Sequence, residues 1–205
     1  MLTNINALTS LYAKKVAQVI TTKLFRSAPK TLDKMYGGFD CIYDNPDCAV
    51  YYKDKVGSSR AIVSFTGVGH ALGGIDLQSP EFYRASQIAS VFFVIDKNRT
   101  WGNHLNIAEI SRLIMELSQN KEITCIGNSM GGFLAILFSS HLAASSVIAF
   151  TPQWSICGKI VPGEQRWRNY RNNISKIVYA DLSSSFNLKA DYLVLFGSGS
   201  GEDMH

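Results

Sequence analysis

No stretch of about eighteen consecutive apolar residues occurs in the sequence, so no part of it is expected to span a membrane as a helix. Charged residues are also few: Asp, Glu, Lys and Arg make up 18% of the 205 residues, against 46% hydrophobic ones. A disordered chain has the opposite balance, so the composition predicts a folded core. The length suits one domain with at most a small appendage.

The sequence is also neither strongly basic nor rich in cysteine. Twenty Lys and Arg against sixteen Asp and Glu leave a net charge of +4, and the basic residues are dispersed, whereas a nucleic-acid-binding surface is usually more basic and forms a stripe. Four cysteines are too few for a disulfide scaffold. Cys41 and Cys48 flank a turn, which suggests cross-strand neighbours with reduced thiols. No His and Cys residues have metal-ligand spacing, so no metal is predicted.

The N-terminus lacks the pattern of a signal peptide. Residues 1–26 show no charged start followed by an apolar block and a small-residue cleavage site, so we expect a cytoplasmic protein. Apolar residues recur there at helical spacing: Ile5, Leu8, Leu11, Tyr12, Val16 and Val19. We expect residues 1–34 to pack as a helical segment on a main domain, residues 35–205. A helix on a membrane surface is the alternative, although Lys15 and Lys23 interrupt the apolar stripe.

Strand-like and helix-like runs alternate through the main domain. Two short runs, 39–43 and 49–53, surround a Pro-containing turn and predict an antiparallel hairpin. Five further runs are apolar at nearly every position: 61–65, 91–95, 123–126, 147–150 and 192–196. Such runs are typical of strands buried on both faces, as in a parallel sheet under helices. Helices are predicted over 107–117 and 130–142 and, more weakly, over 80–89. The pattern therefore predicts an α/β domain.

The most informative segment contains Gly-x-Ser-x-Gly, formed by Gly127, Ser129 and Gly131. It lies between an apolar, β-branched strand and an apolar helix, which is the context of a nucleophile elbow. There the serine occupies a strained strand-to-helix turn, so the residues two before and two after it must be small. The helix N-terminus directs free N–H groups at developing negative charge. A turn that only caps the helix is the simpler alternative.

With this motif in this order of elements, the chain resembles the α/β-hydrolase superfamily from the opening hairpin to the strand ending at Phe196. The resemblance implies a three-layer fold around a mostly parallel, twisted sheet that is short at its C-terminal end. It also implies a serine hydrolase of the esterase, thioesterase or acyltransferase kind, which acts on a small acyl or ester substrate through an acyl-enzyme on Ser129. The loop after the third strand matches in outline, so the N–H groups of Val68 and Met130 would form the oxyanion hole. No cofactor is implied.

The acid and the base of this chemistry are less well matched. The family's acidic residue follows the seventh strand, which here corresponds to Asp203, with Glu202 beside it. The family's histidine follows an eighth strand, and the sequence ends before one, at His205. Among the four histidines, His70 is the best-placed substitute, because its loop neighbours the strand before Ser129 in this fold. His104 is a second candidate, and His141 is expected to be structural.

A serine hydroxyl is a poor nucleophile without a base, so a catalytically inactive or shortened hydrolase-fold binding protein is the alternative function. Residues 149–154 and 165–167 are loosely similar to hydrolase-like proteins linked to bacterial surface polysaccharide synthesis. A dinucleotide-binding interpretation of the glycines at 67, 69 and 73 fails on their spacing. Several aromatic residues are expected to roof the pocket: Phe82, Tyr83, Trp101, Trp154 and Trp167.

Overall fold

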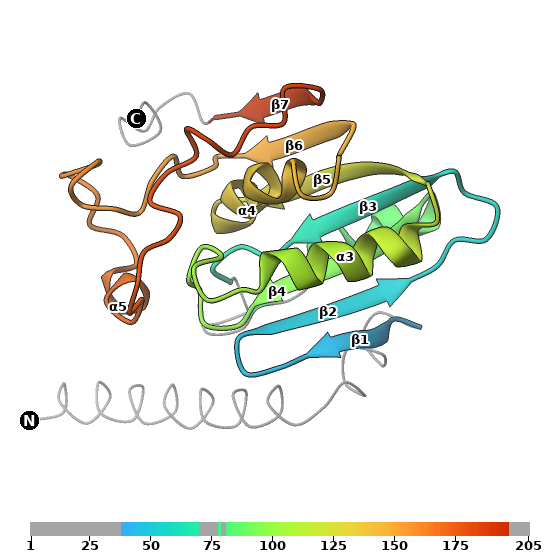
Figure 1. Ribbon diagram of the computed structural model, residues 1–205, viewed down its shortest axis with the longest axis horizontal. Coiled ribbons are helices and arrows are strands. Elements are labelled where there is room, and N and C mark those ends of the chain that lie inside the picture. Colours follow the sequence, from blue (N-terminus) through green and yellow to red (C-terminus); the bar gives the residue numbers. More distant parts are fainter. Residues whose placement is uncertain (1–37, 70–77, 79–80, 197–205) are drawn as a thin grey trace, which may run out of the picture.

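The computed structural model describes residues 38–69, 78 and 81–196. Seven strands form one mixed sheet in the order β1-β2-β4-β3-β5-β6-β7 (Figure 1). Their bounds are β1 Asp40–Asp44, β2 Cys48–Lys53, β3 Arg60–Phe65, β4 Ser90–Asp96, β5 Glu122–Asn128, β6 Ser146–Phe150 and β7 Asp191–Leu195. The predicted hairpin and all five predicted strands are confirmed. The expected helical segment 1–34 lies outside the described residues.

Strand direction places the ends of the central strands together. β2 runs antiparallel to both β1 and β4, and every other neighbouring pair is parallel. The loops that follow β3, β4, β5, β6 and β7 therefore leave from one edge of the sheet, which we call the carboxyl edge. In an open α/β sheet this edge is where ligands bind.

The expectation that the parallel strands are buried on both faces of the sheet is confirmed for β4 and is wrong for β5 and β6. Every residue of β4 is buried, whereas β5 and β6 alternate between more and less covered positions. Two helices, α3 (Ile107–Ser118) and α4 (Met130–Ser139), cover one face (Figure 1). On the other face a smaller apolar cluster lies over β1, β2 and β4. Among the described residues, the coverage of that face is only partial over β5 and β6, where Phe82 stacks on Phe150.

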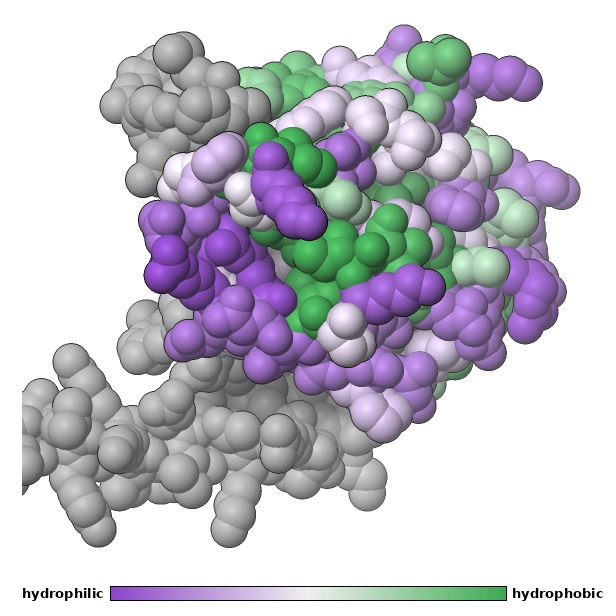
Figure 2. All heavy atoms as spheres, turned by 60° about the vertical axis from the view of Figure 1, so that its left-hand side comes forward, coloured by the Kyte–Doolittle hydropathy of each residue, from purple (hydrophilic) through white to green (hydrophobic). Residues whose placement is uncertain are grey.

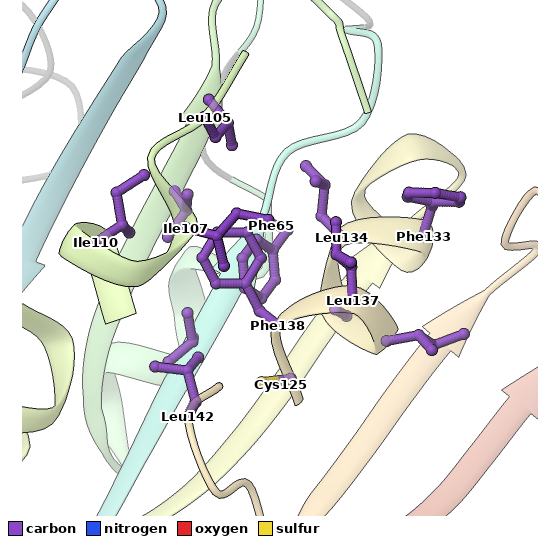
Figure 3. Packing of buried hydrophobic residues seen from close by; sticks show 14 of the residues in the cluster. Phe65, Leu105, Ile107, Ile110, Cys125, Phe133, Leu134, Leu137, Phe138 and Leu142 are labelled. Carbon is purple, nitrogen blue, oxygen red and sulfur yellow. The ribbon is translucent and has the colours of Figure 1, made fainter. Parts of the chain in front are cut away.

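The helices follow the sequence pattern with one shortened end. Asn106 caps α3, because its side chain accepts the Glu109 N–H. All ten residues of α4 are buried, and Figure 3 shows Phe138 and Leu134 of this helix beside Phe65 of β3. The predicted helix to residue 142 is regular only to Ser139. A closing turn follows, in which the Leu142 N–H donates to the Phe138 carbonyl at 2.9 Å and Ala143 adopts the left-handed conformation (φ 46°).

Two other segments depart from regular structure. The weak helix expected over 80–89 is a short 3-10 helix, η1 (Tyr83–Gln87). After β6, residues 151–190 form an irregular excursion with one helical turn, α5 (Arg168–Arg171). Asn103 anchors the excursion, because its Oδ1 accepts the N–H groups of Val178 at 2.6 Å and Tyr179 at 2.8 Å.

The register of the hairpin corrects one expectation. Cys41 lies opposite Tyr51 rather than Cys48, and the pairing shifts by a residue between Cys41 and Tyr43. Cys48 lies at the start of β2, away from the residue that faces Cys41, so the two cysteines are not cross-strand neighbours. No helix among the described residues is long and apolar enough to cross a membrane.

Candidate active site

Ser129 occupies the sharp turn between β5 and α4. Its backbone has φ 54° and ψ −116°, a combination that costs a residue with a side chain about 1–3 kcal/mol. The Ser129 N–H donates to the Phe150 carbonyl at 2.8 Å, which ties the turn to β6. The Ser129 side chain makes no capping hydrogen bond to α4. A serine that only caps the helix is therefore not what the geometry shows.

The two glycines of the motif are required by close backbone contacts. A Cβ atom on Gly127 would lie 2.1 Å from the Gly131 carbonyl oxygen, and one on Gly131 would lie 2.2 Å from the Phe65 carbonyl oxygen. Both distances are far below any real contact, so neither position accepts a side chain without movement of the backbone. The spacing of the motif is thus a packing requirement, and it brings the first turn of α4 against the end of β3.

The loop after β3 is held beside this turn by polar side chains. The Gly67 N–H donates to Glu81 Oε1 at 3.1 Å, and the Gly67 carbonyl accepts from Gln78 Nε2 at 3.0 Å. The next carbonyl, that of Val68, accepts from Arg99 Nε at 2.9 Å. The Arg99 guanidinium also lies over the ring of Tyr170, 5.2 Å from its centroid, which connects the loop to the excursion.

The two amides expected to form an oxyanion hole lie in these two segments. Val68 belongs to the loop after β3, and Met130 is the first residue of α4. Within the part of the chain that the structure describes, neither N–H donates a hydrogen bond. Since Gly131 contacts the end of β3, the two amides come from adjacent pieces of backbone.

His70 and Asp203, the expected base and acid, lie outside the described residues. The chain reaches both of them from the carboxyl edge. His70 directly follows Gly69, the last described residue of the loop that carries Val68. Leu195 at the end of β7 pairs with Phe150, whose carbonyl holds Ser129. The structure brings the starting points of both segments to the side of Ser129.

The other two candidate histidines are placed away from Ser129. His104 Nδ1 lies 4.0 Å from Asp47 Oδ1, in the turn before β2, and β4 and β3 stand between β2 and the strand of Ser129. His141 follows the far end of α4, which spans ten residues, or about 15 Å. The side chain of His141 is exposed there, so its position is remote from Ser129 as expected but does not support a structural role.

Two acids near the carboxyl edge, the buried Asp96 and the partly buried Glu81, had no signal in the sequence. Asp96 at the end of β4 is fully buried and accepts the N–H groups of Thr100 at 2.9 Å and Gly102 at 3.0 Å. Burial raises the pKa of Asp96. Burial also raises the pKa of Glu81, and the hydrogen bond from the Gly67 N–H partly offsets this increase. Their partners lie in loops, where no periodicity announces a contact.

One aromatic residue expected in the pocket roof belongs to the core. Trp101 is fully buried, and its indole N–H donates to Gln153 Oε1 at 2.8 Å. Trp154 is 38% exposed and stacks on Phe186, while Phe82 stacks on Phe150. Figure 2 turns forward the side on which the parallel strands end; hydrophobic residues gather in the middle of this view, with hydrophilic residues around them.

Among the described residues, no group of three or more His, Cys, Asp or Glu side chains is placed to hold a metal ion. No protein-family model matches the sequence, and no curated protein matches it. Solved structures do. The chain is similar to the capsule O-acetyltransferase of Neisseria meningitidis serogroup A, with a TM-score of 0.53 and 16% identity over 78% of this chain and 75% of that one.

Two further solved structures are similar over the same part of the chain. A sugar hydrolase from Lactococcus lactis gives a TM-score of 0.52 and 14% identity over 78% of this chain and 70% of that one. A chain of the glycosylation-associated protein complex from Streptococcus agalactiae gives a TM-score of 0.52 and 15% identity. That match covers 77% of this chain but only 35% of the other chain. The chain has an α/β-hydrolase-like fold. At these identities the likeness concerns the fold alone.

Proposed function

We propose that the protein catalyses acyl transfer through an ester formed on Ser129. The observation that carries this proposal is the strained backbone of Ser129, held between two glycines that admit no Cβ atom. Strain of this kind persists only where the surrounding structure fixes it, and it is common at functional sites. A turn that served only to connect β5 and α4 would not need it.

In the proposed reaction, Ser129 Oγ attacks the carbonyl carbon of an ester or thioester and the alcohol or thiol leaves. The N–H groups of Val68 and Met130 stabilise the negative charge on the carbonyl oxygen, where the loss of one such donor typically costs about 10²–10³ in rate. His70 takes the Ser129 proton and gives it to the leaving group, and Asp203 orients His70. Water, or a hydroxyl of a second substrate, then accepts the acyl group.

We further propose that the acyl group is carried to or from a carbohydrate hydroxyl. The three similar structures bear names connected with saccharides: a capsule O-acetyltransferase, a sugar hydrolase and a glycosylation-associated protein. The exposed indole of Trp154, stacked on Phe186, offers a flat apolar surface of the kind on which sugar rings pack. An O-acylated oligosaccharide is the substrate to test.

A fluorophosphonate probe tests the nucleophile directly, because it forms a covalent bond only with an activated serine. We expect the protein to be labelled and Ser129→Ala to lose the label completely. Ser140→Ala, which changes a serine at the other end of α4, is the matched control and should be labelled like the wild type. Folded wild-type protein that takes no label would contradict the proposal and favour a binding protein without catalytic activity.

A further inference from the structure

Two side chains, Gln78 and Glu81, grip one glycine of the candidate oxyanion loop; we call them the Gly67 clamp. Glu81 Oε1 accepts the Gly67 N–H at 3.1 Å, and Gln78 Nε2 donates to the Gly67 carbonyl at 3.0 Å. Gln78 Nε2 also donates to Thr66 Oγ1 at 3.3 Å. Glu81 is held in turn through its own carbonyl, which accepts from Ser64 Oγ at 2.8 Å. Both polar backbone groups of Gly67 are therefore fixed.

The clamp determines the direction of the Val68 N–H. In a trans peptide the N–H of a residue points opposite to the carbonyl of the residue before it, and no cis peptide bond occurs among the described residues. Because Gln78 holds the Gly67 carbonyl, the Val68 N–H points away from Gln78. Arg99 holds the Val68 carbonyl from its other side. Without these contacts a glycine would leave the peptide free to rotate.

The carboxyl group of Glu81 also faces the nucleophile turn. A Cβ atom on Gly67 would lie 3.0 Å from Glu81 Oε1 and 3.1 Å from the Asn128 carbonyl oxygen, so both oxygens border the same small space. Glu81 Oε1, the oxygen that accepts the Gly67 N–H, therefore lies where the oxyanion loop borders the turn that carries Ser129.

We propose that Gln78 and Glu81 are positioning residues that hold the Val68 N–H toward the oxyanion formed at Ser129. The proposal rests on the proposed function of Ser129. Burial raises the pKa of Glu81, so the acid persists above the ordinary glutamate value of about 4.3. Within the described residues no charged side chain contributes to that shift; the opposing influence is the Gly67 N–H.

A pair of variants of matched size tests the clamp. Gln78→Glu removes the donor that holds the Gly67 carbonyl, whereas Glu81→Gln keeps an acceptor for the Gly67 N–H. We expect Gln78→Glu to slow fluorophosphonate labelling of Ser129 by about tenfold or more, as expected for a misplaced oxyanion donor. Glu81→Gln should label within about twofold of the wild type, because the acceptor is retained.

Two surface variants control for the change of charge: Gln87→Glu in η1 and Glu116→Gln on α3 should both leave labelling unchanged. The melting temperature of each variant separates loss of fold from loss of position. Wild-type labelling by folded Gln78→Glu would overturn the proposal, and so would an equal loss of labelling in Glu81→Gln.

A second measurement distinguishes failure of the clamp from failure of the proposed function. In Ser129→Ala, the NMR signal of the Gly67 N–H should follow the titration of Glu81, and it should lose that dependence in Ser129→Ala combined with Glu81→Gln. If the wild type takes no label but the Gly67 signal titrates, the function of Ser129 fails and the clamp stands as a structural device. A Gly67 signal that does not titrate would refute the clamp whether or not Ser129 is labelled.

Discussion

At the scale of one residue, the backbone conformation of Ser129 lowers stability while it suits the proposed function. Its φ of 54° and ψ of −116° are accessible to glycine and costly to any residue that has a Cβ atom. The fold holds the serine there through the Phe150 carbonyl and through contacts that exclude side chains at Gly127 and Gly131. The position of the proposed nucleophile is therefore one at which the native residue is not the most stable choice.

Ser129→Gly is accordingly expected to be more stable than Ser129→Ala by about 1 kcal/mol in the free energy of unfolding. The relief of about 1–3 kcal/mol of strain exceeds the extra entropy that glycine gives the unfolded chain, about 0.5–1 kcal/mol. Urea denaturation of the two variants measures the difference. At Ser140, which has ordinary helical angles, glycine should instead be less stable than alanine, and the same order at both sites would refute the argument.

The elbow could be predicted because its requirements are local. Gly127, Ser129 and Gly131 stand within five residues, and the strand before them and the helix after them each have their own pattern. The clamp could not be predicted, since Gln78 and Glu81 contact Gly67 across 11 and 14 residues of sequence without a periodic pattern. The burial of Trp101 could not be predicted for the same reason. Its hydrogen-bond partner Gln153 is 52 residues away, so no residue near Trp101 in the sequence indicated that it is buried.

At the scale of the element, α4 connects the site to the core. The helix begins at the nucleophile turn, and its side chains fill the space between the sheet and α3 (Figure 3). Phe138 near its end is fully buried, and its ring centroid lies 4.9 Å from that of Phe65 in β3. Because Phe65 directly precedes the loop that carries Val68, this contact also supports the candidate oxyanion loop.

Phe138→Ala is expected to lower the free energy of unfolding by about 3–5 kcal/mol, as large-to-small changes of a buried aromatic residue do. The midpoint of urea denaturation measures the loss. Phe196→Ala is the matched control, since 54% of the Phe196 surface is exposed, and it should change stability by less than about 1 kcal/mol. Equal effects of the two substitutions would show that α4 does not pack as described.

At the scale of the whole molecule, the edge opposite the site has its own polar network. Asp54 Oδ1 accepts from Lys121 Nζ at 2.7 Å, Ser90 Oγ at 2.7 Å and Tyr52 OH at 2.9 Å. These residues come from β2, the start of β4 and the turn before β5. The hydrogen bond from Lys121, followed by those from Ser90 and Tyr52, holds the pKa of Asp54 well below its usual range.

This network predicts a pH dependence of stability. A carboxyl group whose pKa is lowered by folding contributes stability above its unfolded pKa of about 3.9, and that contribution is lost as the pH falls toward the folded value. Asp54→Asn should therefore lower the urea midpoint at pH 7 and lower it progressively less below about pH 4. A difference from the wild type that is the same at pH 7 and pH 3 would contradict the assignment.

The uneven burial of the sheet has a consequence for how the site opens. β4 is buried at every residue, whereas every residue of β7 is exposed or only partly covered. Backbone hydrogen bonds near solvent break most readily in local fluctuations of the native state. β7 also leads into the segment that contains Asp203. In the proposed site, Ser129 is followed by the fully buried helix α4, whereas the segment of the proposed acid follows the least covered strand, so brief local opening of β7 would disable the site long before the protein unfolds.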